Sequence, residues 1–334
     1  MSLTPDADNT ATPDEGLSWE LIYPKTTTAI FSLAVSNVIL SSMGCAGNIF
    51  IMVIISKWSN ISSGAAFMFS LALADFLSGF YDGFVDELLP LLGLSLDLVN
   101  SSLCAICTFM NRLTTIASFW ITALFSVDKC FAVIFPYRYR VWGKPKVCVV
   151  ATLTVYILNA ALTVPDLFVL GVDNEYSGMC HAVKFDILSR YLYFELRTPI
   201  IILFGAGLPT ATVVICALVT LIKIRLDQRK RSDQSGTSKQ RNSPRARLDA
   251  EITRQMIVVC FLFGVIMVTS SAIIRVNHGS EPKTAGDEAK YTLLDRINSV
   301  LTSMINAANF YLYLIFGKKF RNDFKRLFQK QNGE

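Results

Sequence analysis

Charged residues and histidines are scarce in this sequence, and each shortage excludes a class of protein. Asp, Glu, Lys and Arg make up only 17% of the 334 residues, whereas an average soluble domain has about 25%. Hydrophobic residues make up 52% and the mean hydropathy is +0.44, so the composition predicts a protein of the lipid bilayer. The two histidines, His181 and His278, lie far apart and do not suggest a metal centre.

Motifs of enzymes and of structural zinc sites are missing too. The sequence contains no HExxH, no GxSxG and no paired intramembrane Asp motif. Cys104 and Cys107 have the spacing of half a zinc site, but no second pair matches them. We therefore expect no catalytic residue and no enzymatic activity. The net charge is +5, and the basic residues lie between and after the apolar runs. We therefore interpret them as a topology signal and expect no nucleic acid partner.

Seven apolar runs are each long enough to cross a bilayer as a helix, which takes about 20 residues. They lie at roughly 29–56, 64–92, 101–127, 147–171, 194–224, 254–276 and 293–316. This pattern predicts an all-α membrane protein with a seven-transmembrane helix bundle over residues 29–316. No internal repeat is visible, so an inverted-repeat transporter gains no support from this feature.

The segments outside the runs differ in charge. Segment 1–28 is largely polar and acidic and has no basic-then-apolar signal pattern. Most of the 31 Lys and Arg residues lie in connections that would share a side with the C-terminus. By the positive-inside rule, we expect a multi-pass plasma membrane protein with an extracellular N-terminal tail (1–28), a third cytoplasmic loop at about 227–250 and a cytoplasmic C-terminus.

Within the last segment, 317–334, residues 318–328 alternate apolar residues, mostly Phe, with basic residues at helical spacing. Such a segment lies on the lipid surface with its basic side toward anionic headgroups. It predicts a short amphipathic eighth helix followed by a cytoplasmic tail. On the predicted outer side, Asn100 begins an Asn-Ser-Ser sequon and is a candidate glycosylation site, although a chance sequon explains it equally well.

One acidic residue, Asp75, lies deep inside the second run. Ionisable groups within a membrane span are costly and usually face the protein interior. Polar residues at similar depth in three other runs can converge with Asp75, namely Asn48, Ser118, Asn306 and Asn309. We predict an internal sodium and water site at Asp75. The alternative is a water-solvated acid that only helps the helices to pack.

Short motifs in a fixed order make the chain resemble the rhodopsin-like (class A) G-protein-coupled receptors over about residues 29–328. The motifs are Gly47-Asn48, Leu71-Ala72-Leu73-Ala74-Asp75, Cys104, Asp128-Lys129-Cys130, Pro136, Cys180, Pro209, Phe261 and Asn309-xxx-Tyr313. The resemblance implies a receptor that transduces an extracellular ligand to heterotrimeric G proteins. It also implies a disulfide bond between Cys104 and Cys180, both expected outside the cell, where disulfides persist.

The resemblance assigns roles to two further groups of residues. One group would switch G-protein coupling, and its members are Asp128, Lys129, Cys130, Asn309 and Tyr313. The other would be an apolar core that relays ligand binding inward, and its members are Phe119, Pro209 and Phe261. An apolar trio in a membrane bundle is ordinary packing by default, so this second role depends on the resemblance alone.

Three departures from the family's pattern affect the expected activation path but not the fold. Lys129 stands where the family has Arg, and a flexible ammonium is not equivalent to a planar guanidinium. Phe310 replaces a proline, so we expect a straighter seventh helix. The stretch Phe263-Gly264-Val265-Ile266-Met267 stands where Cys-Trp-x-Pro is expected.

The ligand pocket is predicted from four polar residues. Asn111 and Arg112 stand where receptors for biogenic amines place an Asp, so an amine is disfavoured. Asp82 and Asp86 are four residues apart within the second run and would lie on one helix face. An acidic outer surface steers cationic ligands, and we expect a small basic neuropeptide. The alternatives are a chemosensory receptor for an environmental small molecule and, with less support, a membrane transporter.

Overall fold

The computed structural model describes residues 22–59, 61–172, 180–182, 197–234, 269 and 284–329. Within these residues, six helices are long and apolar enough to cross a membrane. They coincide with six of the seven expected runs. The remaining run, 254–276, lies outside the described residues except for Thr269. The architecture confirms the prediction of an all-α membrane bundle.

The elements follow one another with short connections in most of the described chain. In order they are α2 (Pro24–Ser56), α3 (Ser63–Phe80), the π-helix η1 (Tyr81–Leu88), α4 (Leu89–Leu91), α5 (Leu96–Val99), α6 (Ser101–Ile134), α7 (Pro136–Trp142), α8 (Pro145–Thr163), α9 (Asp166–Val169), β1 (Leu170–Val172), β2 (Cys180–Ala182), α11 (Thr198–Ile201), the π-helix η3 (Ile202–Gly207), α12 (Leu208–Gln234), α14 (Ala285–Phe316) and α15 (Lys318–Gln329). Helix α12 thus extends into the segment that we expected to form a loop from about residue 227.

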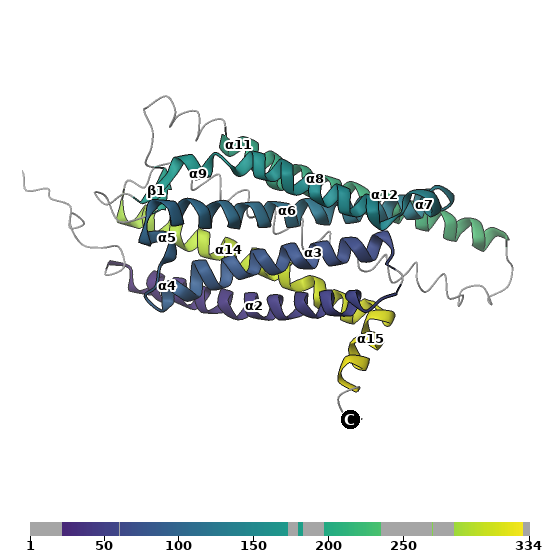
Figure 1. Cartoon of the computed structure of the whole chain (residues 1–334), viewed down its shortest axis with the longest axis horizontal. Coiled ribbons are helices and arrows are strands. Elements are labelled where there is room, and N and C mark those ends of the chain that lie inside the picture. The colour runs from purple at the N-terminus through teal and green to yellow at the C-terminus, as the bar shows by residue number, and fades with distance from the viewer. Residues whose placement is uncertain are drawn as a thin grey trace, which may run out of the picture.

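The long helices lie side by side, and α6 is central among them (Figure 1). Helix α6 contacts α3, α8 and α12, while α2 packs against α3 and α14. One end of the bundle carries the antiparallel pair β1–β2, in which Val172 lies opposite Cys180. The other end carries α7 and α15, and α15 turns away from the long axis of the bundle (Figure 1). We call these the sheet end and the α15 end.

Side-chain caps fix the starts of two membrane helices. The Ser62 hydroxyl accepts a hydrogen bond from the Ala65 N–H at the start of α3 (3.2 Å), and Asn100 Oδ1 accepts one from the Leu103 N–H at the start of α6 (2.9 Å). Each such cap stabilises a helix by about 0.5–2 kcal/mol. The cap uses Asn100 Oδ1 whereas a glycan is attached through Nδ2, so capping is compatible with the predicted glycosylation.

The π-helical segments η1 and η3 were not expected from the sequence. Such segments are rare in proteins and are frequent at functional sites. Segment η1 continues α3 without a break and carries two buried acids, Asp82 and Glu87. Gly83 lets η1 approach α2, because a Cβ at this position would overlap the Ser41 side chain. Segment η1 therefore decides which acidic side chains enter the bundle near the sheet end.

Small residues allow α2 and α14 to pack closely. A Cβ added to Gly44 would lie 3.2 Å from the Ala307 Cβ, and a Cβ added to Gly47 would lie 2.8 Å from the Phe310 Cβ. Small residues at a helix interface let the backbones approach, which favours helix association in membranes. Helix α14 continues through Phe310 as one α-helix from Ala285 to Phe316.

An aromatic cluster joins α15 to the bundle. The Phe310 ring lies 6.1 Å from that of Phe320 and 5.6 Å from that of Phe324, measured between ring centroids. The Phe324 ring also meets Phe50 of α2 edge-on, at 5.4 Å. Phe320 is buried, whereas the basic residues Lys318 and Lys319 next to it are exposed. The short amphipathic eighth helix is therefore present.

Replacing Gly47 with alanine is expected to weaken the interface between α2 and α14. The new Cβ would come within 2.8 Å of the Phe310 Cβ, and such overpacking costs about 1–3 kcal/mol. Purified Gly47→Ala protein should therefore unfold at a temperature several degrees below that of the wild type. Gly207→Ala is the matched control, because its Cβ would meet neighbours only at 3.5 Å or more. Equal melting temperatures of the two variants would contradict this packing.

Candidate functional site

The carboxylate of Asp75 is buried in the middle of the bundle, with 1% of the residue exposed. Ser118 of α6 donates its hydroxyl to Asp75 Oδ1, and Asn309 of α14 donates from Nδ2 to Asp75 Oδ2 at 2.7 Å. Three helices thus meet at one acid. The sequence predicted a convergence of four, but Asn48 of the fourth helix, α2, donates to the backbone oxygen of Asn306 and not to Asp75. Hydrogen bonds from two helices compensate for the loss of water around this group.

A second group of polar residues surrounds Asn306 of α14. Its side-chain Nδ2 donates to the Ser78 hydroxyl at 3.1 Å, and its backbone oxygen accepts from Asn48 Nδ2 at 3.1 Å. The side-chain oxygens of Asn48 and Asn306 are buried and accept no hydrogen bond from the described residues. Hard cations prefer oxygen ligands. The residue set around Asp75 therefore fits the predicted sodium ion, which stays a prediction.

Hydrogen bonds extend this polar group toward the sheet end. Ser78 and Thr115 share one at 2.9 Å between their hydroxyls, and Thr115 donates to Asn111 Oδ1 at 3.2 Å. Asn111 Nδ2 in turn donates to Asp86 Oδ2 at 2.6 Å. A continuous chain of side chains thus leads from Asp86 through α6 and α3 to Asn306. We call it the polar chain.

The four residues of the predicted ligand pocket fall into two groups. Asp86 and Asn111 belong to the polar chain, and Asp82 is close to it because its Oδ2 atom lies 3.5 Å from Ser78 Oγ. Arg112 belongs to the other group, since its Nη1 lies 2.8 Å from Asp166 Oδ1. Asn111 and Arg112 are neighbours on α6 but contact different parts of the bundle.

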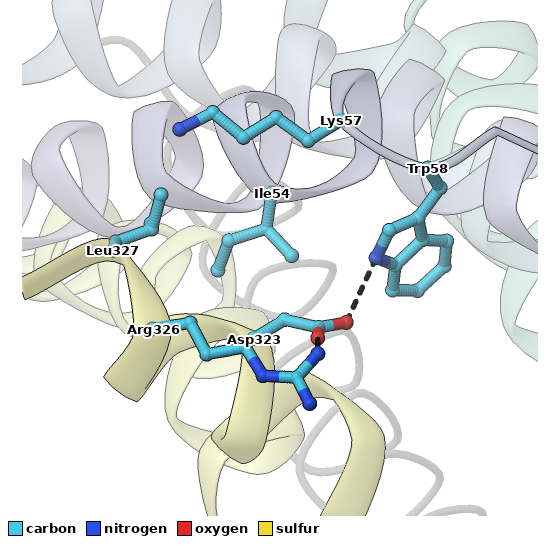
Figure 2. Close-up of a pocket in the computed structure, with 6 residues that line it drawn as sticks. All are labelled: Ile54, Lys57, Trp58, Asp323, Arg326 and Leu327. Carbon is cyan, nitrogen blue, oxygen red and sulfur yellow. Dashed lines mark hydrogen bonds and ion pairs between the residues drawn. The ribbon is translucent and has the colours of Figure 1, made fainter. Parts of the chain in front are cut away.

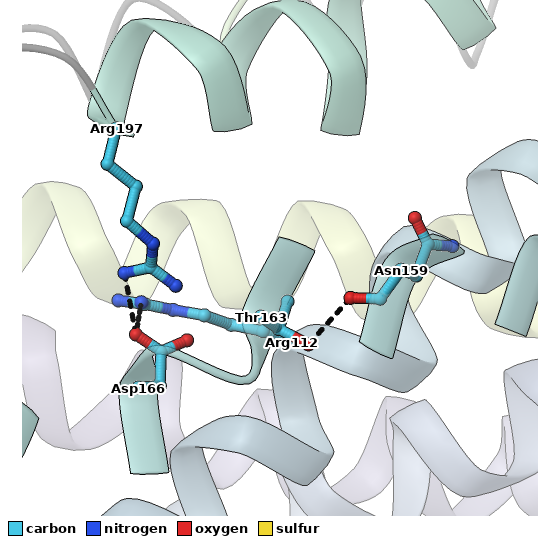
Figure 3. A network of polar contacts seen from close by, with 5 residues as sticks. All are labelled: Arg112, Asn159, Thr163, Asp166 and Arg197. Atoms are coloured by element: carbon cyan, nitrogen blue, oxygen red, sulfur yellow. Dashed lines mark hydrogen bonds and ion pairs between the residues drawn. The ribbon is translucent and has the colours of Figure 1, made fainter. Parts of the chain in front are cut away.

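Asp166 accepts two arginines at the sheet end (Figure 3). Its Oδ1 atom lies 2.8 Å from Arg112 Nη1 of α6 and 2.7 Å from Arg197 Nη1, just before α11. Asp166 is fully buried, and Arg197 is largely so. The group has a net charge of +1 and joins α6, α9 and the start of α11. We call it the arginine pair site.

A third charged group, at Glu87, was not identified from the sequence. Glu87 of η1 is buried, and its carboxylate accepts Arg296 Nη1 of α14 at 2.5 Å and Asn37 Nδ2 of α2 at 3.3 Å. From the sequence, Glu87, Asp166 and Arg296 were indistinguishable from charges at helix ends. Only the geometry of η1 and α14 brings Glu87 and Arg296 together.

The predicted coupling switch is divided between two places. Asp128 accepts the Ser63 hydroxyl at 2.7 Å and the Tyr139 hydroxyl at 3.0 Å, while Lys129 Nζ lies 3.9 Å from Asp128 Oδ2. Burial, together with the negative charge of Asp128, raises the pKa of Tyr139 to about 12. The phenol therefore stays protonated and donates to Asp128 at physiological pH.

The other members of the predicted switch lie away from Asp128 or act as packing groups. Asn309 binds Asp75, and the Tyr313 ring packs 5.8 Å from that of Phe320. Cys130 is a buried thiol. The Lys129 ammonium lies 4.8 Å from the centre of the Phe125 ring, within the range of a cation–π interaction.

The predicted apolar core is described only in part. Phe119 is buried among Ala206 of η3 and Ile305 of α14, and Pro209 is buried near the start of α12. Phe261 lies outside the described residues.

Cys104 takes part in a disulfide bond, at the buried start of α6 beside Leu170 of β1. The backbone of Cys180 lies in β2, which pairs with β1, while the Cys180 side chain lies outside the described part. The pairing of Cys104 with Cys180 stays a prediction.

Removing the charge of Asp166 is expected to destabilise the fold. In Asp166→Asn, two arginines would face a neutral amide, and breaking a buried ion pair costs about 3–5 kcal/mol. The melting temperature of the purified protein should fall strongly. Asp227→Asn is the matched control, because its pair with Lys223 is a half-exposed i,i+4 contact worth about 0.3–0.5 kcal/mol. Similar small shifts in both variants would contradict a structural role for Asp166.

Comparison with known proteins agrees with this architecture. The family model for the 7 transmembrane receptor (rhodopsin family) matches residues 47–307. Somatostatin receptor type 5 of Rattus norvegicus is 22% identical, over 100% of this chain and 88% of the relative. The type 5 receptor of Bos taurus is 23% identical, over 69% of this chain and 58% of the relative.

The type 1 somatostatin receptor of Rattus norvegicus is 22% identical, over 85% of this chain and 68% of the relative. At such identities these relatives indicate similarity but do not identify a ligand. The family model, in contrast, covers well over half of the sequence. The protein therefore belongs to the rhodopsin family of seven-transmembrane receptors.

Proposed function

We propose that this receptor binds an extracellular peptide at its sheet end and activates a heterotrimeric G protein at its α15 end. Membership of the family supports a signalling role, and the relatives named above are receptors for somatostatin. The observation that carries the proposal is the polar chain. It connects Asp86, near the sheet end, with Asn306, which lies one helical turn before Asn309, the partner of Asp75.

The orientation in this proposal follows from the distribution of charge. The α15 end carries basic residues around α7, the start of α8 and α15. Basic connections lie on the cytoplasmic side of membrane proteins. The sheet end would then face the exterior, together with the disulfide at Cys104.

The charges at the sheet end favour a ligand that has a cationic group. Asp82 and Asp86 lie along η1, and the amide of Asn111 donates to Asp86. An amide orients a carboxylate but leaves its negative charge in place. A cationic group of a basic peptide that reached Asp86 would change the hydrogen bond to Asn111 and so act directly on the polar chain.

At the opposite end, the ammonium of Lys129 is the group proposed to reach the G protein. Its contact with Asp128 is long, at 3.9 Å, whereas two hydroxyls bind Asp128 more closely. Asp128 is thus already stabilised without the lysine. Lys129 can leave this contact without exposing an unsatisfied carboxylate, which lowers the free energy needed to present its ammonium to a partner.

The ligand proposal predicts a loss of potency when the acids of η1 are neutralised. A peptide library is first screened in cells with promiscuous G-protein reporters. For an agonist found there, Asp86→Asn should lower potency at least tenfold, because a hydrogen bond to a charged group contributes about 1.5–3 kcal/mol. Asp82→Asn should act in the same direction.

The control for this experiment is Asp287→Asn, which neutralises an acid near the start of α14 that is bonded to Thr284. Surface expression is measured for every variant. Unchanged potency in both Asp82→Asn and Asp86→Asn, at normal expression, would show that the pocket lies elsewhere.

The switch proposal predicts that Lys129→Ala uncouples binding from signalling. Agonist-stimulated nucleotide exchange should fall at least tenfold while agonist binding in membranes stays within about threefold of the wild type, since Lys129 is far from the sheet end. Lys146→Ala, an exposed lysine at the start of α8, should retain exchange. Full exchange in Lys129→Ala would exclude this lysine from the coupling step.

A further inference from the structure

A cavity of about 280 Å³ lies between the end of α2 and α15. Its lining residues are Ile54, Lys57, Trp58, Asp323, Arg326 and Leu327. Figure 2 shows Asp323 between Trp58 and Arg326, below the last turn of α2. The volume is close to the lower limit of typical small-molecule sites, about 300 Å³, which suits a headgroup-sized occupant.

Positive charge predominates around the cavity. Lys57 and Arg326 are exposed and lie on its two walls. Lys319 lies over the Trp58 ring, with Nζ 3.7 Å from the ring centre. Against these three cations stands the carboxylate of Asp323, which accepts Trp58 Nε1 at 3.0 Å and lies 3.5 Å from Arg326 Nη1. The site has a net positive charge and suits an anion.

The apolar part of the lining continues toward the lipid. Ile54 and Leu327 form the apolar side of the cavity. The neighbouring Val53 and Phe328 are large apolar residues that are exposed. Helix α2 ends at Ser56, so Lys57 and Trp58 lie where its membrane span ends. Tryptophan and lysine both favour this interfacial depth.

We propose that this cavity binds the headgroup of an anionic phospholipid. The phosphate would accept hydrogen bonds from Lys57 and Arg326, and the acyl chains would leave along Val53 and Phe328. Free phosphate has the same charged chemistry but lacks the acyl chains that the apolar side would accommodate. The inference requires only that the chain spans a bilayer. It is therefore independent of the proposals that the receptor binds a peptide and activates a G protein.

The first experiment measures lipid bound to the purified full-length receptor by native mass spectrometry. Phosphatidylglycerol, phosphatidylcholine and inorganic phosphate are added separately at equal concentration. Phosphatidylglycerol adducts should exceed phosphatidylcholine adducts several-fold, and phosphate should not displace them. Lys57→Gln/Arg326→Gln should reduce the phosphatidylglycerol adducts at least fivefold.

The matched control is Lys146→Gln/Lys325→Gln. It removes the same number of positive charges at the α15 end, from exposed residues that do not line the cavity. Equal losses in the two double variants would overturn the site in favour of general surface charge. Displacement of the lipid by inorganic phosphate would overturn the lipid as occupant.

A second variant tests the electrostatic argument by a predicted increase in lipid binding. Asp323→Asn removes the one negative charge in the lining but keeps a side-chain oxygen for Trp58 Nε1. Phosphatidylglycerol adducts should increase about two- to fivefold, an outcome that misfolding does not produce. Reduced or unchanged binding in Asp323→Asn would contradict an anionic occupant.

Discussion

The carboxylate of Asp75 must remain hydrogen-bonded in the middle of the bundle, and this requirement fixes the positions of three helices. A polar group left unsatisfied in such an environment costs several kcal/mol. Ser118 of α6 and Asn309 of α14 meet the requirement by donating to the two oxygens. A shift of either helix along its axis would break one of these bonds, so α3, α6 and α14 are held at a common depth.

Nearer the sheet end, two buried acids of the described residues form ion pairs with arginines of other elements. On one side of the bundle, Glu87 binds Arg296 and Asn37 and so connects η1 with α14 and α2. On the other side, Asp166 receives Arg112 and Arg197. Helix α6 contributes Arg112 to the second group and takes part in the polar chain as well. Arg112 and Asn111 of α6 thus connect this helix both to the arginine pair site and to the polar chain.

Much of the fold was accessible from the sequence because long apolar runs allow few alternatives in a bilayer. The hydrogen bonds of Ser118 and Asn309 to Asp75 were predictable as well, since a buried acid needs polar neighbours at its own depth. Glu87 shows the limit of this reasoning. Its burial depends on the π-helical backbone of η1, and residue periodicity gives no signal for that geometry.

The arginine pair site illustrates a second limit. Asp166 stands at the end of an apolar run, where a solvated acid is the ordinary interpretation. Its partners Arg112 and Arg197 are 54 and 31 residues away in the sequence, and only the packing of α6, α9 and α11 brings them together. Long-range ion pairs of this kind have no local pattern, whereas helix caps such as Asn100 do.

Segment η1 also has a consequence for how this receptor is aligned with its relatives. Each residue of a π-helix turns the chain through a smaller angle than a residue of an α-helix does. Side chains beyond Tyr81 therefore rotate progressively away from the faces that an uninterrupted α-helix would give them. A relative with a regular helix at this point would present different positions to the bundle interior. A sequence alignment alone would then equate residues that point in different directions, from Tyr81 to the end of this span.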